Sequence, residues 1–199
     1  MDTGIILLNF GEPEDPTPEV VVAYLERIFR TNMSLEGNLP PERVQARVKQ
    51  LAEERAPGLI EELKSIGGSP LHRQAVAQAE ALEAELGRRG HDARCYVAYQ
   101  FTEPLIADVV RQAREDGVSR VVGLPVYPLA GPSTTVAALE DLRRAVAEAA
   151  WDVEIREVGG WHRHPDFTAM WADAVRETAS RAGVALRDPR VRLVFAVHG

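Results

Sequence analysis

The sequence predicts an α/β protein that is built on a parallel, mainly four-stranded sheet with helices on both faces. Short apolar runs alternate along the chain with longer segments of helical periodicity, and glycine or proline stands at most of the junctions. This alternation is typical of parallel strands that are joined by right-handed helical crossovers. The first apolar run, Gly4 to Phe10, is unbroken, as expected for a strand that is covered on both faces.

Each predicted strand is a short run of apolar, often β-branched residues between turn residues. The strands are expected at residues 4–10, 92–99, 118–126 and 153–158. Each predicted helix has apolar residues at intervals of three and four. The helices are expected at residues 18–29, 41–55, 71–89, 104–115, 134–150 and 166–182, with a further short one from residue 59. Thr17 ahead of Pro18, and Ser133 or Thr134, are the expected N-caps.

Two segments depart from a plain strand–helix repeat. Residues 31–65 lengthen the connection between the first two strands, and such extended connections usually serve as lids or pocket walls. The chain ends on another apolar run that closes with His198 and Gly199, which predicts a last strand. We therefore expect a first domain over residues 1–165, a connecting helix over 166–190 and, in 191–199, the first strand of a truncated second domain.

Composition excludes several classes of protein. The net charge of −7 argues against sequence-independent binding of nucleic acid, which needs a basic surface. The single cysteine, Cys95, excludes an internal disulfide and a cysteine zinc cluster and fits a reducing cytosol. A membrane-spanning helix needs a run of about 18 apolar residues, and no apolar run in this sequence comes near that length. Any membrane association is therefore expected to be transient. The first strand starts too near Met1 for a signal peptide, and we expect a cytoplasmic protein of undefined oligomeric state.

The carboxyl ends of parallel strands meet at one edge of a sheet, where open α/β proteins bind ligands. Amide, aromatic and imidazole side chains follow the predicted strands, at residues 9–11, 99–102, 126–128, 159–162 and 198–199. The glycine patterns of dinucleotide sites and phosphate loops are absent from these segments, and so is a nucleophile elbow. Aromatic groups beside an imidazole suit a flat, apolar ligand, with the imidazole available for a metal.

Four segments in the same order along the chain resemble motifs of the ferrochelatase family. They are Leu7-Leu-Asn9-Phe10-Gly11-Glu-Pro13, Ile66-Gly67-Gly68-Ser69-Pro70-Leu71, Gly123-Leu-Pro-Val-Tyr127-Pro128 followed by Ser133-Thr134-Thr135, and Phe195-Ala-Val-His198-Gly199. Together they span the chain from its first strand to its last residue, and each lies at a predicted strand end or turn.

The resemblance implies a lyase reaction, the insertion of ferrous iron into a porphyrin in haem synthesis, on a three-layer chelatase-like fold of two similar halves. His198 would be the catalytic, metal-handling residue, and its partner glutamate would lie in a second half that this chain lacks. The expected porphyrin-binding residues are Asn9, Phe10, Gly11, Arg30, Ser69, Tyr127 and Thr134. Gly11 and Gly199 would let the backbone approach the flat ligand closely. No tightly bound cofactor is expected; ferrous iron and the porphyrin are the substrates.

The sequence also departs from the family pattern. Phe10 stands where the coproporphyrin-using branch has an iron-ligating tyrosine, so the choice between protoporphyrin and coproporphyrin stays open. Two other functions stay open as well: a chelatase for another metal and tetrapyrrole, and a non-catalytic flavodoxin-like module that binds a flat ligand. Several candidates have ordinary structural alternatives: Asn9 as a turn residue, Ser69 and Thr134 as helix caps, and Arg30 as a solvated residue. His72 has no partner that the sequence identifies.

Overall fold

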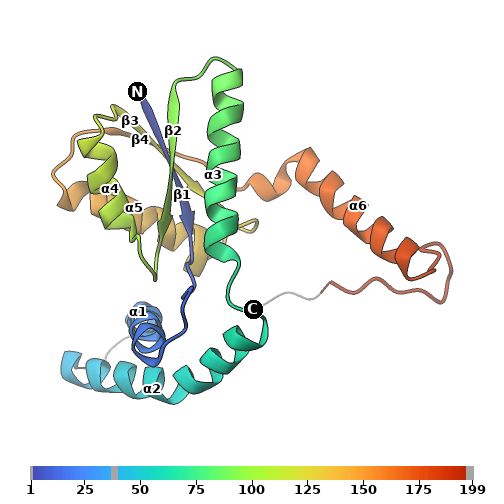
Figure 1. Ribbon diagram of the computed structural model, residues 1–199, viewed down its shortest axis with the longest axis horizontal. Helices are drawn as coiled ribbons and strands as arrows, with labels where there is room; N and C mark the ends of the chain where they lie inside the picture. Colours follow the sequence, from blue (N-terminus) through green and yellow to red (C-terminus); the bar gives the residue numbers. More distant parts are fainter. Residues whose placement is uncertain (1, 37–39, 196–199) are drawn as a thin grey trace. The chain divides into compact units, whose positions relative to one another are not determined.

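The computed structural model describes residues 2–36 and 40–195; residues 1, 37–39 and 196–199 lie outside the described part. It confirms the α/β class and the four-stranded parallel sheet (Figure 1). The strands are β1 (Thr3–Asn9), β2 (Ala93–Tyr99), β3 (Arg120–Pro125) and β4 (Glu154–Glu157), in the spatial order β2-β1-β3-β4. The strands predicted at residues 4–10, 92–99, 118–126 and 153–158 are therefore present, each within a few residues of its expected bounds.

Helices cover both faces of the sheet, as predicted. The helices of the described residues are α1 (Pro18–Glu36), α2 (Pro41–Ser65), α3 (Leu71–Arg88), α4 (Ile106–Glu115), α5 (Ala137–Glu148) and α6 (Pro165–Arg181), and those that pack on the sheet are α3, α4 and α5. A π-helical turn, Pro132–Val136, leads into α5, and a 3₁₀ turn, Trp161–Arg163, precedes α6. In Figure 1, α3 lies on one side of the strands, α4 and α5 lie on the other, and α1 and α2 lie beyond the carboxyl end of β1.

The central strand β1 supplies both faces of the core because successive side chains of a strand point to opposite sides. Ile5 and Leu7 pack with Ala79 of α3 in one cluster. Ile6 and Leu8 belong to a larger cluster with residues of α4 and α5. This double burial explains why the sequence of β1 is an unbroken apolar run.

The insertion between β1 and β2 differs from the sequence prediction. Residues 41–65 form one helix with Pro57 inside it, and not a helix to residue 55 followed by a short one from 59. Ala52, Ala56 and Leu63 of this helix are buried, and the first two form a third apolar cluster with α1. Because the same face is buried before and after the proline, packing against α1 keeps the helix continuous.

Two N-cap predictions have different outcomes. Thr17 caps α1, because its Oγ1 accepts a hydrogen bond from the Val20 N–H at 3.4 Å. The expected cap at Ser133 or Thr134 is wrong: the helical turn begins at Pro132, its N-cap is Gly131, and no side chain caps it. Proline is favoured at the first helical position because it has no N–H to satisfy.

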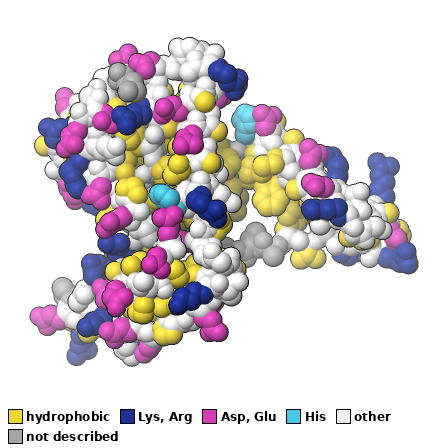
Figure 2. All heavy atoms as spheres, in the orientation of Figure 1, with side chains coloured by type: hydrophobic (Ala, Val, Ile, Leu, Met, Phe, Trp, Pro, Cys, Tyr) yellow, Lys and Arg dark blue, Asp and Glu magenta, His cyan; other side chains and the backbone are white. Residues whose placement is uncertain are grey.

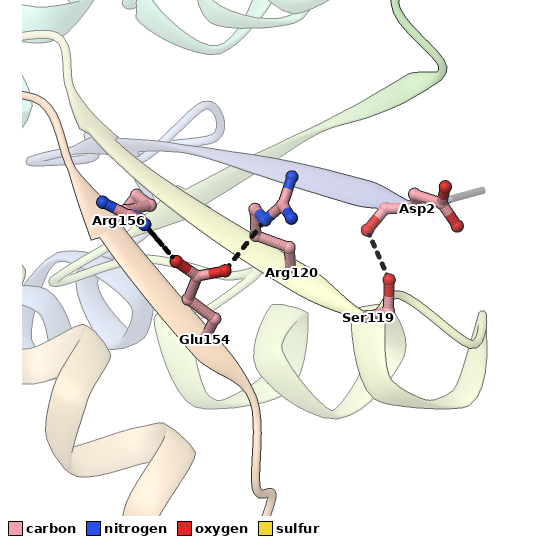
Figure 3. Close-up of polar contacts among 5 residues, drawn as sticks. All are labelled: Asp2, Ser119, Arg120, Glu154 and Arg156. Atoms are coloured by element: carbon pink, nitrogen blue, oxygen red, sulfur yellow. Dashed lines mark hydrogen bonds and ion pairs between the residues drawn. The ribbon is translucent and has the colours of Figure 1, made fainter.

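The outer strand β4 is short and carries charged side chains (Figure 3). Glu154 accepts hydrogen bonds from Arg120 of β3, at 3.0 Å, and from Arg156, at 2.5 Å. These hydrogen bonds, first that of Arg120, lower the pKa of Glu154. On the same side of the sheet, the Ser119 hydroxyl donates to the Asp2 carbonyl at 2.9 Å. Charged groups on a short edge strand discourage pairing with further strands.

The chain divides into two compact units at Gly159–Gly160. In the second unit, His164 caps α6 by accepting a hydrogen bond from the Asp166 N–H, and Trp161, Phe167 and Trp171 make successive edge-to-face contacts. No residue of α6 is buried; Met170 and Trp171 are exposed, and Figure 2 shows hydrophobic side chains along this part of the chain.

The predicted terminal strand lies only partly within the described residues. Residues 191–195 have no regular secondary structure, and residues 196–199, with His198, lie outside the described part. The strand over 191–199 and the domain division at 165 and 190 therefore stay predictions. Within residues 2–36 and 40–195, no helix has both the length and the apolar content that crossing a membrane requires.

Candidate functional site

The loops after β1 and β2 run side by side at the carboxyl edge of the sheet. Backbone pairing continues beyond the strands: the Gln100 N–H donates to the Asn9 carbonyl at 3.0 Å, and the Phe101 N–H to the Phe10 carbonyl at 3.1 Å. On the other side of β1, the Val126 N–H donates to the Leu8 carbonyl at 3.0 Å. Three strand ends are thereby fixed to one another, and their first loop residues share one corner.

Asn9 and Phe10 occupy this corner in different ways. The Asn9 side chain accepts a hydrogen bond from the Phe10 N–H at 2.8 Å, which is the turn role that the sequence left open. The Phe10 ring packs against Phe101, with ring centroids 4.5 Å apart, and against Tyr24 of α1, at 6.4 Å. Phe10 therefore connects the sheet edge to the apolar cluster beneath α1 and α2.

The backbone conformation and the close neighbours at position 11 both require glycine. Its φ of +88° lies in the left-handed region, and a Cβ at this position would lie 2.2 Å from the Thr102 Oγ1 and 3.0 Å from the Tyr99 Cβ. Only glycine fits such a close approach. The close approach that Gly11 makes in the structure is to the loop after β2.

Ser69 connects two loops and begins a helix. Its hydroxyl donates a short hydrogen bond to the Glu12 carboxylate, in the loop after β1. The same hydroxyl accepts a hydrogen bond from the Leu71 N–H at 3.1 Å, at the first residue of α3. The N-cap residue of α3 is Pro70 and no side chain caps the helix, so Ser69 is not its N-cap; its contact with Glu12 places this turn beside the carboxyl edge.

A pocket of about 290 Å³ lies next to these loops and contains a histidine–tyrosine pair. The Tyr99 hydroxyl lies 2.7 Å from the His72 Nδ1, so the expectation that His72 lacks a partner is wrong. Burial, and after it the charge of Glu14, raises the pKa of Tyr99 to about 12, which keeps this phenol neutral. Glu12, Tyr24, Arg27 and Glu103 also line the pocket.

Tyr127 lies at the end of a second polar chain. Its hydroxyl donates to the Gln100 Oε1 at 2.7 Å, and the Gln100 Nε2 donates to the Asp141 Oδ2, on α5, at 3.2 Å. The Tyr127 ring packs against the core cluster below α4 and α5. Burial, more than the neighbouring Tyr24 and Asp141, raises the pKa of Tyr127, so its hydroxyl is a neutral donor.

Two predicted porphyrin-binding residues make only contacts within or between neighbouring helices. Arg30 is exposed on α1, where its Nη2 lies 3.3 Å from the Gln45 Oε1 and 3.9 Å from the Glu26 carboxylate. The Thr134 hydroxyl donates to the Gly131 carbonyl at 3.3 Å, within the turn that starts α5. The contacts of Arg30 match its structural alternative of a solvated residue, whereas Thr134 donates to the N-cap residue and does not cap the helix itself.

The predicted metal residue cannot be placed, since His198 lies outside the described residues. Among residues 2–36 and 40–195, no three His, Cys, Asp or Glu side chains gather closely enough to hold a metal ion.

The structure adds residues that sequence reasoning did not select. Gln100, Glu12, Tyr99 and His72 all lie at the same edge as Asn9, Phe10, Ser69 and Tyr127. The available signal was position, because Tyr99 is the last residue of the second predicted strand and Gln100 directly follows it.

A parallel sheet whose carboxyl edge gathers aromatic, amide and carboxylate groups beside a pocket defines an α/β ligand-binding protein. Residues 2–199 match the family model "Ferrochelatase", and the chain belongs to the ferrochelatase family.

Curated relatives agree with this assignment. The chain is 36% identical over 202 residues to a ferrochelatase of Synechococcus sp. (strain JA-3-3Ab) and 30% identical over 200 residues to that of Geotalea uraniireducens (strain Rf4). These alignments cover 99% and 98% of this chain but only 57% and 59% of the two relatives. A solved structure from Marinobacter aquaeolei VT8, described as a cobalamin (vitamin B12) biosynthesis CbiX protein, is 19% identical with a TM-score of 0.46, over 90% of this chain and 98% of that chain. That TM-score is too low to support a fold assignment by itself.

Proposed function

We propose that the whole protein inserts ferrous iron into a porphyrin, as a lyase of haem biosynthesis. The observation that carries this proposal is the family match over residues 2–199, which includes the segment ending at His198. The gathering of Asn9, Phe10, Ser69 and Tyr127 at one sheet edge supports it, because a flat ligand needs several loops to form its binding wall. The chain spans somewhat more than half of its curated relatives, at 57% of the first, so the proposal concerns the protein that contains this chain.

Metallation requires that ferrous iron lose its water shell and that two pyrrole protons leave the macrocycle. We assign the metal and proton steps to His198, since a neutral imidazole has a free lone pair at neutral pH, with an ordinary pKa of about 6.5. The proposed partner is a glutamate beyond this chain. Phe10 and Tyr127 would hold the macrocycle, and an apolar wall favours bending of the ring toward its metallated shape.

The finer parts of the proposal follow from composition and motif. We place the protein in the cytoplasm, without a tightly bound cofactor and without a nucleic-acid partner. We retain Gly11, Arg30 and Thr134 as proposed porphyrin contacts, and residues 191–199 as the first strand of a second similar half. Phe10 cannot ligate iron, so both protoporphyrin and coproporphyrin are substrates to compare.

The test is an anaerobic absorbance titration of the whole protein, first with each porphyrin and then with ferrous iron. We expect porphyrin binding followed by the spectrum of the metallated product. Insertion of cobalt or nickel but not iron would identify the alternative chelatase, and binding without metallation would identify a non-catalytic module. Absence of porphyrin binding would contradict the proposal.

His198→Ala tests the assigned residue. We expect loss of iron insertion with porphyrin affinity retained, because the imidazole acts on the metal and the pyrrole protons while the loops hold the ring. His91→Ala, at an exposed histidine beside the amino end of β2, is the matched control and should keep full activity. Unchanged turnover of the His198→Ala protein would refute the assignment.

A further inference from the structure

Gln100, in the loop after β2, makes hydrogen bonds to three other segments: the end of β1, the loop after β3 and helix α5. Its backbone N–H donates to the Asn9 carbonyl, at 3.0 Å, which ties the loop after β2 to the end of β1. Its side chain accepts from the Tyr127 hydroxyl, after β3, and donates to Asp141 of α5. None of the predicted porphyrin contacts makes side-chain hydrogen bonds to so many of these elements within the described part of the chain.

The orientation of the Gln100 amide is fixed by its neighbours. An ionised carboxylate can only accept, so the Gln100 NH₂ group faces Asp141 and its oxygen faces Tyr127. Arg144 pairs with the other Asp141 oxygen and holds that carboxylate. The Tyr127 hydroxyl, neutral because burial raises its pKa, must then donate to Gln100. In this series of hydrogen bonds, the donor and the acceptor of each bond are therefore fixed.

The hydrogen bond at the hydroxyl restricts the Tyr127 ring. The ring packs on the core cluster on one side and is half-buried, so packing alone does not enclose it. A hydrogen bond at the far end of the ring removes rotational freedom that a bound ligand would otherwise have to remove. The backbone N–H of Gln100 also bonds the Asn9 carbonyl, so Gln100 holds the Asn9–Phe10 corner at a set distance from the Tyr127 ring.

We propose that Gln100 is a positioning residue of the porphyrin site, which holds the Tyr127 ring in place relative to the Asn9–Phe10 corner before the ligand binds. The inference rests on the proposed function, since it concerns the affinity of that same site. Gln100 acts through Tyr127 and not by contact with the reacting atoms.

The test is a double-mutant cycle on porphyrin affinity in the whole protein, measured by absorbance titration. Gln100→Leu removes both side-chain hydrogen bonds while keeping similar size and the backbone bond to Asn9. Tyr127→Phe removes only the hydroxyl. Because each single variant loses the hydrogen bond between Gln100 and Tyr127, we expect each to raise the porphyrin Kd roughly five- to tenfold. We expect the double variant to bind like either single variant, since both remove the same contact.

Two further measurements separate positioning from general damage. Gln78→Leu, at an exposed glutamine of α3, should leave the Kd unchanged. Asp141→Asn, which permits the Gln100 amide to turn over, should raise the Kd in the wild-type background but not in the Tyr127→Phe background. This variant keeps the inference testable if Gln100→Leu does not fold. Effects of Gln100 and Tyr127 that multiply, or an unchanged Kd in Gln100→Leu, would overturn the inference. If the wild-type protein binds no porphyrin, the proposed function fails, and the positioning role fails with it.

Discussion

At the scale of single residues, the missing side chain of Gly123 determines how closely α5 approaches the sheet. A Cβ at this position in β3 would lie 2.6 Å from the Leu142 Cδ2 and 3.0 Å from the Leu139 Cδ2. Leu142 is fully buried, so its side chain has no open solvent to move into. Because interiors are close-packed, even one methyl group at Gly123 must displace the helix or distort a leucine rotamer.

We therefore expect Gly123→Ala to lower the free energy of unfolding by about 1–3 kcal/mol, the usual cost of overpacking a core. Urea denaturation followed by circular dichroism measures this change. The matched control is Gly87→Ala in α3, where a Cβ would have no neighbour within 4 Å. Alanine is the better helix former, so the control should be neutral or more stable by up to about 1 kcal/mol. Equal stability of Gly123→Ala and the wild type would contradict this account of α5.

At the scale of elements, α2 shows tertiary packing overriding a local helix breaker. Pro57 has no N–H to donate to the carbonyl four residues earlier, and its ring crowds that carbonyl. Nevertheless the helix continues, because Ala56 and Leu63 are buried on either side of the proline. Figure 1 shows α2 as a curved helix, as expected when a proline interrupts its hydrogen bonds.

Pro57→Ala should restore the missing backbone hydrogen bond at an exposed position. We expect a gain of about 1 kcal/mol in the free energy of unfolding, less than the roughly 3 kcal/mol helix penalty of proline, because the bent helix is already packed. Thermal denaturation followed by circular dichroism checks this. A loss of stability would mean instead that the bend is needed to bury Leu63.

The elements that the sequence predicted well are those whose pattern is local. Strand β1 buries alternate residues against α3 and against α4 and α5, and this produces an unbroken apolar run of strand length between turn residues. The break expected at Pro57 was wrong because the burial of Ala56 depends on α1, which a local pattern does not contain. The N-cap expected at Ser133 or Thr134 was wrong for a different reason, since Pro132, which needs no N–H partner, begins the helical turn ahead of both.

The candidate site was predictable only where it follows directly from strand ends. Asn9, Phe10 and Tyr127 lie at the expected edge because parallel strands bring their carboxyl ends together. The contacts between Tyr99 and His72, and between Ser69 and Glu12, join residues that are 27 and 57 positions apart. Their formation depends on how α3 and the loop after β1 dock on the sheet, and sequence spacing does not encode that geometry.

At the scale of the whole molecule, buried phenols and a half-buried thiol make the fold sensitive to alkali. Burial raises the pKa of Cys95 to about 11, with a further contribution from Glu83, and the pKa of Tyr96 to about 12. Tyr99 behaves in the same way, and the pKa values of Tyr24 and Tyr127 are also raised, chiefly by burial. In the unfolded chain these groups would ionise near pH 8.5 for the thiol and about 10 for the phenols.

Stability should therefore be full below about pH 8.5 and fall as the pH rises toward about 12, because the unfolded state releases its protons first. We expect the urea midpoint to be constant between about pH 7 and 8 and to drop progressively above about pH 9. Tyr24→Phe removes one titrating group and should make this fall shallower. A urea midpoint that stays constant up to about pH 11 would show that these side chains are exposed to solvent.

The division of the chain at Gly159–Gly160 also separates its natural chromophores. All four tyrosines lie before this boundary, whereas Trp161 and Trp171 lie after it and Trp151 before it. Selective excitation of indole fluorescence therefore samples chiefly the segment of α6, and phenol absorbance samples the sheet and its helices. A single unlabelled preparation thus carries two optical signals that report on different parts of the chain, apart from the contribution of Trp151 to the indole signal. Superimposable denaturation curves from the two would indicate one cooperative system, and staggered curves would reveal two.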